Sequence, residues 1–223
     1  MGFIIFKLIK DQKIFAYLHG GYWQWGSIDA SCFMAENFVQ QEIVVAPIGY
    51  NLAPNVTMTQ IVEQVERSIA KILELSIDCD IYVCGHSAGG HLASILLNCD
   101  FETKYNSKNL NQIKAIIPVS GVFDLEPLIR TDINDNLKMN EQEARLLSPL
   151  LMNDCYLNKD IRVLLAYGEE DSIAFKEQSH DYKKHLKEKL RLLNVECIQI
   201  DKVDHFNAIE NLSRDDYQLT KVF

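Results

Sequence analysis

The sequence of 223 residues lacks the features that mark membrane, secreted and nucleic-acid-binding proteins. No apolar run reaches the roughly 20 residues that a membrane-spanning helix needs. The opening segment MGFIIFKLIK is interrupted by Lys7 and Lys10 and precedes no small-residue cleavage site, so it does not match a signal peptide. A net charge of −9 leaves no basic patch for nucleic acid or an anionic membrane surface. We therefore expect neither nucleic acid nor a membrane as a partner.

Metal-site and disulfide patterns are also missing from the chain. The six cysteines form no C-x-x-C pair, and neither H-E-x-x-H nor H-x-x-E-H occurs. Cys79, Cys84 and Cys197 lie in or beside apolar runs, which is typical of buried free thiols. We therefore expect a reducing, cytoplasmic location, no metal and no cofactor.

What the sequence does contain is an alternation of short apolar runs and helical patterns. Strands are expected near 14–18, 42–46, 81–85, 113–119, 161–167 and 195–200, and helices near 31–40, 57–75, 88–98, 141–147, 172–191 and 206–212. Runs such as IYVCG are apolar at consecutive positions, as in parallel strands that are covered on both faces. The sequence therefore predicts a single α/β domain over residues 1–223 with a mostly parallel, doubly wound sheet.

Two polar segments fall outside this regular pattern. The stretch 124–158 is the least regular, and we expect it to be a lid-like insertion between two elements of the sheet. The basic run from Lys183 to Arg191 is interrupted by Leu186, Glu188 and Leu190. That spacing predicts the solvated face of a helix rather than a binding patch.

The segment 81–91, IYVCGHSAGGH, combines a strand-like run, a G-x-S-x-G turn and an apolar helical run. This is the setting of a nucleophile elbow, in which a strained turn lifts the serine hydroxyl clear of the backbone. Gly85 and Gly89 permit the sharp turn. The alternative is a plain Gly-Ser turn, but the strand–turn–helix context favours Ser87 as a nucleophile.

A second loop, His19–Trp23, follows the first expected strand with the sequence HGGYW. Paired glycines allow backbone N–H groups to approach a substrate oxygen closely. Gly20, Gly21 and Tyr22, together with the N–H of Ala88, are therefore candidates for an oxyanion hole. The alternative is a simple Gly-Gly turn.

A carboxylate and a histidine follow in the order that α/β-hydrolases use, Ser…Asp…His. Asp171 lies deepest in the loop after the strand near 161–167 and is preferred to Glu169 and Glu170, although all three could form a solvated turn or helix cap. His205 follows the last expected strand. With Ser87, these residues predict a triad that forms and hydrolyses an acyl-enzyme.

The other histidines fit structural roles better. His180 and His185 lie in the charged helix, where we expect exposure, and His19 is expected to brace the glycine loop through hydrogen bonds. His86 occupies the variable position of the elbow, and His91 lies on the helix that follows.

Together these motifs resemble kynurenine formamidase (arylformamidase), a branch of the α/β-hydrolases close to the hormone-sensitive-lipase-like esterases. The H-G-G-x-W signature of that family is present at His19–Trp23, and its elbow at Gly85–Gly90. Flanking segments are similar too: YNLAP at 50–54, SGVFDLEPL at 120–128, LSP at 147–149 and VDHF at 203–206. The resemblance runs from about residue 14 to the end.

The resemblance implies an α/β-hydrolase fold and cleavage of N-formyl-L-kynurenine, an aryl formamide, to L-kynurenine and formate in tryptophan catabolism. A formyl group needs only a small acyl pocket, and an aniline is a better leaving group than an alkyl amine. Tyr22, Trp23 and Trp25 could offer aromatic faces to the aryl ring. For Trp23, packing beneath the glycine loop is an equal alternative.

The chain departs from the family at its N-terminus, since only 18 residues precede His19 where relatives carry early strands. We expect these N-terminal strands to be reduced or missing, with Phe3–Leu8 replacing one edge strand. An uncovered edge favours association, so a homodimer is one expected state. A small-acyl carboxylesterase with the same triad, or an inactive shortened isoform, are the alternative functions.

Overall fold

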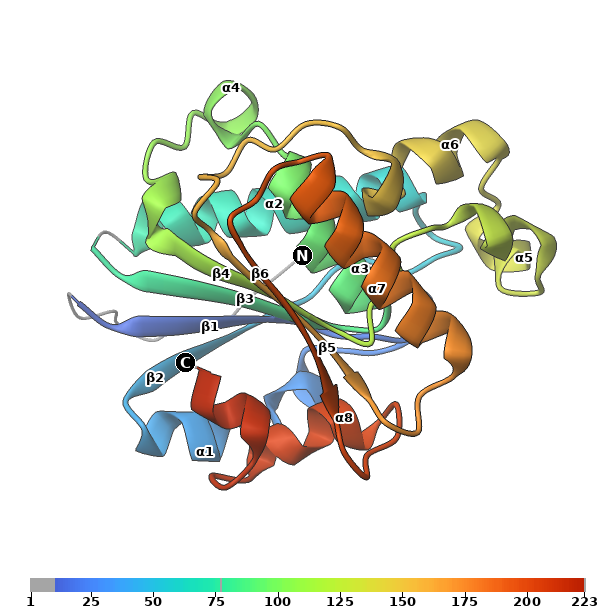
Figure 1. Ribbon diagram of the computed structural model, residues 1–223. Helices are drawn as coiled ribbons and strands as arrows, with labels where there is room; N and C mark the ends of the chain where they lie inside the picture. Colours follow the sequence, from blue (N-terminus) through green and yellow to red (C-terminus); the bar gives the residue numbers. More distant parts are fainter. Residues whose placement is uncertain (1–10, 77, 223) are drawn as a thin grey trace.

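The computed structural model describes residues 11–76 and 78–222, in which a six-stranded sheet lies between layers of helices (Figure 1). The strands are β1 (Lys13–Leu18), β2 (Ile43–Ile48), β3 (Asp80–His86), β4 (Ile113–Val119), β5 (Arg162–Gly168) and β6 (Asn194–Ile200). Their order is β2-β1-β3-β4-β5-β6, and every neighbouring pair is parallel. The predicted parallel α/β sheet is confirmed. The edge strand expected at 3–8 lies outside the described residues.

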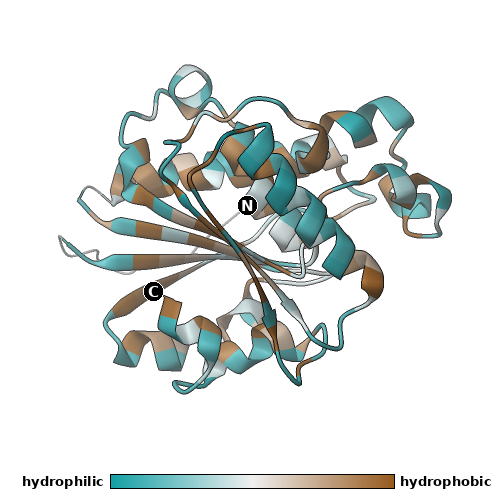
Figure 2. Ribbon diagram, in the orientation of Figure 1, coloured by the Kyte–Doolittle hydropathy of each residue, from teal (hydrophilic) through white to brown (hydrophobic). Residues whose placement is uncertain are grey.

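Successive residues of a strand point to opposite faces of the sheet, and both faces are buried here. In β1, Ile14, Ala16 and Leu18 belong to the larger hydrophobic cluster, whereas Phe15 and Tyr17 belong to the cluster on the other face. The continuous apolar runs of the strands follow from this double coverage. Figure 2 shows the apolar residues concentrated along the strands and on the helix faces that meet them.

Helices cover both faces of the sheet. They are α1 (Ala35–Gln40), α2 (Met58–Leu75), α3 (Ala88–Ile95), α4 (Phe101–Tyr105), α5 (Asn134–Leu137), α6 (Glu141–Leu146), α7 (Ile173–Glu188) and α8 (Asn207–Glu210). In Figure 1, α1 and α8 lie on one face, and α2, α3 and α7 on the other. None of the helices in the described ranges has the length and apolar character that crossing a membrane requires.

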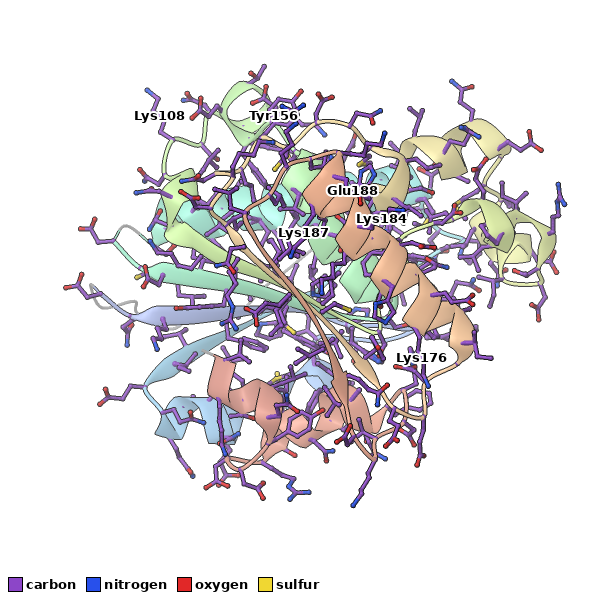
Figure 3. The ribbon with its side chains drawn as sticks, in the orientation of Figure 1. Lys108, Tyr156, Lys176, Lys184, Lys187 and Glu188 are labelled. Atoms are coloured by element: carbon purple, nitrogen blue, oxygen red, sulfur yellow. The ribbon has the colours of Figure 1, made fainter. Side chains whose placement is uncertain are left out.

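Local sequence explains where the long helices begin and which face they expose. Thr57 caps α2 in a capping box, because its side chain accepts from the N–H of Gln60 while Gln60 accepts from the N–H of Thr57. In α7, Lys184, Lys187 and Glu188 are exposed and project from the outer side of the helix (Figure 3). The prediction that this charged run is a solvated helix face is confirmed up to Glu188, whereas Lys189–Arg191 lie beyond the end of α7.

The strand order creates a switch point between β1 and β3. From β1 the chain turns to β2 on one side of the sheet and then crosses to β3 on the other. In such sheets, ligands bind in the crevice at the carboxyl ends of the strands beside the switch. The glycine loop follows β1 and the G-x-S-x-G turn follows β3, so the fold brings these two predicted motifs side by side.

Candidate active site

Ser87 lies at the turn between β3 and α3, with φ of 54° and ψ of −116°. This is strained backbone for a residue with a side chain. The neighbouring glycines are required by close packing: a Cβ at Gly85 would lie 2.0 Å from the carbonyl oxygen of Gly89, and one at Gly89 2.0 Å from that of Leu18. The predicted elbow conformation therefore depends on Gly85 and Gly89.

The glycine loop forms a left-handed turn beside the elbow. Gly21, Tyr22 and Trp23 have φ of 105°, 48° and 59°, and the Gly21 carbonyl accepts from the N–H groups of Gln24 and Trp25, both at 2.9 Å. A Cβ on Gly21 would lie 2.4 Å from the Trp25 oxygen, so only glycine fits. Gly20, Gly21 and Tyr22 line the same pocket as Ser87.

Asp171 and His205 form a hydrogen-bonded pair, with 2.7 Å between Asp171 Oδ1 and His205 Nδ1. The Asp171 side chain is fully buried and that of His205 is 22% exposed. Burial raises the pKa of Asp171, but hydrogen bonds from His205, Ser120 and the Gly168 N–H outweigh it, so the pKa falls below its usual value. The carboxylate is therefore held ionised against the imidazole.

Ser120 is a site residue that the sequence did not single out. It follows β4 with φ of 48°, is fully buried, and donates its hydroxyl to Asp171 Oδ2 at 2.5 Å. The Gly168 N–H donates to the same oxygen at 2.9 Å. The available signal was the position of Ser120 directly after a predicted strand, in the segment SGVFD.

A pocket of about 790 Å³ opens at Ser87 and His205. Its wall includes the aromatic side chains of Tyr22, Trp25, Phe33, Phe175 and Phe206. Trp25 and Phe206 are more than half exposed at 57% and 64%, so apolar surface is available to a ligand. Among the described lining residues Glu210 is the one carboxylate, and none is Lys or Arg.

Trp23 lies in the core and does not line this pocket. Its indole is completely buried and meets the His91 ring edge-on at 5.1 Å, while its carbonyl accepts from the Ala53 N–H at 2.9 Å. Of the two weighed roles, the geometry favours packing beneath the glycine loop over contact with substrate. The left-handed turn is the physical reason, since it directs Trp23 inward and leaves Trp25 at the pocket.

The remaining histidines have structural partners. His19 contacts the Gly20 carbonyl at 2.8 Å and stacks on Tyr50, as expected for a residue that braces the glycine loop. His91 is buried and donates to the Leu147 carbonyl at 2.7 Å. His180 is exposed, whereas His185 is half-buried and bonds to the Met152 carbonyl, so the expected exposure holds for His180 only.

The insertion at 124–158 contains α5, α6 and two short 3-10 helices, Glu126–Arg130 and Pro149–Leu151. It contacts Gln24, the residue directly after the glycine loop, which donates to the Ile133 carbonyl at 2.9 Å and accepts from Asn136 at 2.8 Å. None of the described pocket residues comes from this insertion. In this structure it supports the glycine loop rather than covering Ser87.

Comparison with known proteins agrees with this geometry. The model of the BD-FAE family matches residues 7–186. The kynurenine formamidases of Salmo salar and Danio rerio are each 39% identical to this chain, over 215 and 219 residues, and each alignment covers 95% of this chain and 72% of the relative. The kynurenine formamidase of Drosophila melanogaster is 30% identical and is covered over 73% of its length, with 96% of this chain aligned.

Solved structures show the same fold. A Silicibacter sp. protein of 28% identity superposes with a TM-score of 0.81, and the match covers 96% of this chain and 76% of the Silicibacter chain. An arylesterase of 22% identity has a TM-score of 0.71, and the match covers 97% of this chain and 75% of the arylesterase. A Pyrobaculum calidifontis esterase of 20% identity has a TM-score of 0.70, and the match covers 92% of this chain and 73% of the esterase. Identity to the formamidases, the BD-FAE match and the shared fold establish that this chain belongs to the kynurenine formamidase family of α/β-hydrolases.

Proposed function

We propose that this protein is a serine hydrolase that cleaves N-formyl-L-kynurenine to L-kynurenine and formate, with Ser87, His205 and Asp171 as its triad. The observation that carries the proposal is the 2.7 Å hydrogen bond between the buried Asp171 and His205, whose partly exposed ring lines a pocket that also contains Ser87. The family relationship supports the formamide as substrate.

The proposed reaction begins with proton transfer from the Ser87 hydroxyl to His205 Nε2 as the serine oxygen attacks the formyl carbon. Because Nδ1 of His205 is bonded to ionised Asp171, the imidazolium that forms is oriented and stabilised. The proton transfer requires a hydrogen bond from the Ser87 hydroxyl to His205 Nε2, and we propose that this bond forms in the reaction. His205 then protonates the aniline nitrogen as the C–N bond breaks, and water releases formate from Ser87 in a second cycle.

The negative oxygen of the tetrahedral intermediate needs fixed N–H donors. Gly20, Gly21 and Tyr22 lie beside Ser87, and Ala88 is the first residue of α3, where backbone N–H groups have no partner within the helix. We therefore assign the oxyanion hole to these four residues. A single such donor is typically worth a factor of about 10²–10³ in rate.

The pocket suits an aryl amide with a small acyl group. Gly20 and Gly21 surround Ser87 with little side-chain volume, which leaves room for a formyl hydrogen. Tyr22 and Trp25 present aromatic surface where the kynurenine ring would lie, and we propose them as its contacts. Trp23 would contribute by supporting the loop from beneath.

The decisive experiment compares N-formyl-L-kynurenine with p-nitrophenyl acetate, using wild type and Ser87→Ala. We expect wild type to prefer the formamide in kcat/KM, and Ser87→Ala to abolish turnover of both while its thermal unfolding is unchanged. A clear preference for the ester would replace the formamidase proposal with the carboxylesterase alternative. A cooperative unfolding transition without activity on either substrate would favour an inactive form.

Two further properties complete the proposal. No disulfide joins any of the six cysteines, all of which lie in the described residues. This supports a cytoplasmic location, and fractionation of the source cells would test it. In the described residues, β2 and β6 are the outer strands of the sheet. Association through such an edge would give a homodimer, and light scattering distinguishes it from a 25.6 kDa monomer.

A further inference from the structure

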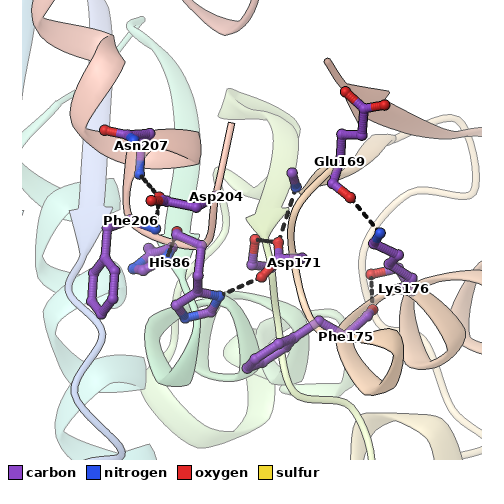
Figure 4. Close-up of polar contacts among 12 residues, drawn as sticks. His86, Glu169, Asp171, Phe175, Lys176, Asp204, Phe206 and Asn207 are labelled. Atoms are coloured by element: carbon purple, nitrogen blue, oxygen red, sulfur yellow. Dashed lines mark hydrogen bonds and ion pairs between the residues drawn. The ribbon is translucent and has the colours of Figure 1, made fainter. Parts of the chain in front are cut away.

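His86, the variable residue of the elbow, lies between the parts of the site. Its Nε2 is 2.8 Å from the backbone carbonyl oxygen of His205, and the two imidazole ring centroids are 4.6 Å apart (Figure 4). His86 is 6% exposed and lines the same pocket as Ser87. Neither the triad nor the oxyanion hole explains why a histidine is buried there.

The hydrogen bond fixes the tautomer of His86. A carbonyl oxygen only accepts, so Nε2 must carry the hydrogen and donate it to His205. Burial, followed by the charge of His205, lowers the pKa of His86 to about 3, so the ring is neutral at physiological pH. Nδ1 then carries only a lone pair. A neutral donor at this place holds His205 without opposing the positive charge that His205 gains in catalysis.

The other edge of the His86 ring faces the glycine loop. A Cβ added to Gly20 would lie 3.0 Å from His86 Nδ1 and 3.2 Å from the Ser87 Cβ. His86 therefore contacts both the loop that supplies oxyanion donors and the loop that supplies the base, and it directly precedes the nucleophile.

We propose that His86 is a positioning residue, whose ring N–H holds the backbone of the His205 loop so that the imidazole of His205 faces Ser87. Asp171 fixes only the far side of that imidazole, at Nδ1. Asp204 shapes the following turn by accepting from the N–H groups of Phe206 and Asn207 at 2.9 and 2.7 Å (Figure 4). In the described structure the bond from His86 is the one that ties the His205 main chain to the elbow.

The proposal rests on the proposed Ser87–His205 chemistry but not on the identity of the substrate. His86→Leu removes the donor and keeps apolar bulk, and His86→Gln places an amide N–H close to the Nε2 position. A misplacement of about 1 Å at a reacting group can cost about 10²-fold in rate, so we expect His86→Leu to lower kcat about 10- to 100-fold. KM should change little, and His86→Gln should recover most of the loss.

The assay measures kcat per active site, with sites counted by complete reaction with a chromogenic organophosphate. Both N-formyl-L-kynurenine and p-nitrophenyl acetate are used, because misplacement of His205 slows either reaction. If wild type hydrolyses the ester but not the formamide, the proposed substrate is refuted, while the role of His86 can still be tested on the ester.

His185→Leu is the matched control, since His185 also bonds a backbone carbonyl, that of Met152 at 2.6 Å, but lies outside the pocket lining. It should alter unfolding temperature without altering kcat per site. The proposal is overturned if His86→Leu keeps wild-type kcat per site, or if His86→Gln is as slow as His86→Leu despite equal unfolding temperatures.

Discussion

Ser120→Ala offers the sharpest test of how the site holds its carboxylate. The hydroxyl of Ser120 lies 2.5 Å from Asp171 Oδ2, and both side chains are buried. The substitution removes this donor but leaves Asp171 bonded to His205 and to the Gly168 N–H. It therefore removes one of three hydrogen bonds to a buried charge without removing the charge.

The expected magnitude follows from the type of bond. Hydrogen bonds to charged groups contribute about 1.5–3 kcal/mol, so we expect a loss of about 2 kcal/mol in the free energy of unfolding at neutral pH. Replacing a triad aspartate by asparagine costs about 10⁴ in kcat, whereas Ser120→Ala keeps the carboxylate. We expect a fall in kcat of about tenfold, which corresponds to about 1.4 kcal/mol.

The effect on stability should depend on pH in one direction. The pKa of Asp171 in the folded protein lies below its usual value of 3.8. The ionised carboxylate therefore adds to the free energy of unfolding above pH 3.8, and this contribution is lost as the pH falls through the folded pKa. Ser120→Ala raises the folded pKa. The stability difference between wild type and variant should therefore be largest near neutrality and should shrink on acidification below the usual pKa.

Urea unfolding at several pH values and steady-state kinetics measure both effects. Ser68→Ala is the matched control, because Ser68 is fully buried in α2 and donates to the Gln64 carbonyl at 2.9 Å. It should lose about 1 kcal/mol at every pH, with unchanged kcat. A stability loss in Ser120→Ala that does not vary with pH, accompanied by wild-type kcat, would refute the role assigned to Ser120.

Two other predictions test the pocket. Trp25→Ala should raise KM for the aryl substrate with little change in urea unfolding. Trp23→Ala should instead lower the free energy of unfolding by about 3–5 kcal/mol, because only Trp23 is fully buried. The opposite pattern would exchange the roles of the two tryptophans. Glu210, exposed at the pocket, should attract the α-ammonium group of N-formylkynurenine. Glu210→Gln should lower kcat/KM for N-formylkynurenine about two- to fivefold, as expected for an exposed ion pair, and should leave kcat/KM for formanilide unchanged. Equal losses on both substrates would exclude this contact.

Much of the fold and the elbow could be predicted because their causes are local. Consecutive apolar residues produced the strands, and the glycines at 85 and 89 are the residues that the sharp turn around Ser87 demands. Ser87, Asp171 and His205 each follow a strand, and the carboxyl ends of parallel strands lie at the same end of the sheet. This placed the three residues together.

The contacts that complete the site depended on the tertiary structure alone. Ser120 meets Asp171 across 51 residues, and His86 meets the His205 carbonyl across 119, because β3, β4, β5 and β6 lie next to one another in the sheet. No local pattern encodes such a pairing. Likewise, the left-handed turn after β1 decided that Trp23 enters the core and Trp25 lines the pocket, since side-chain direction in a turn follows backbone dihedrals that residue type does not fix.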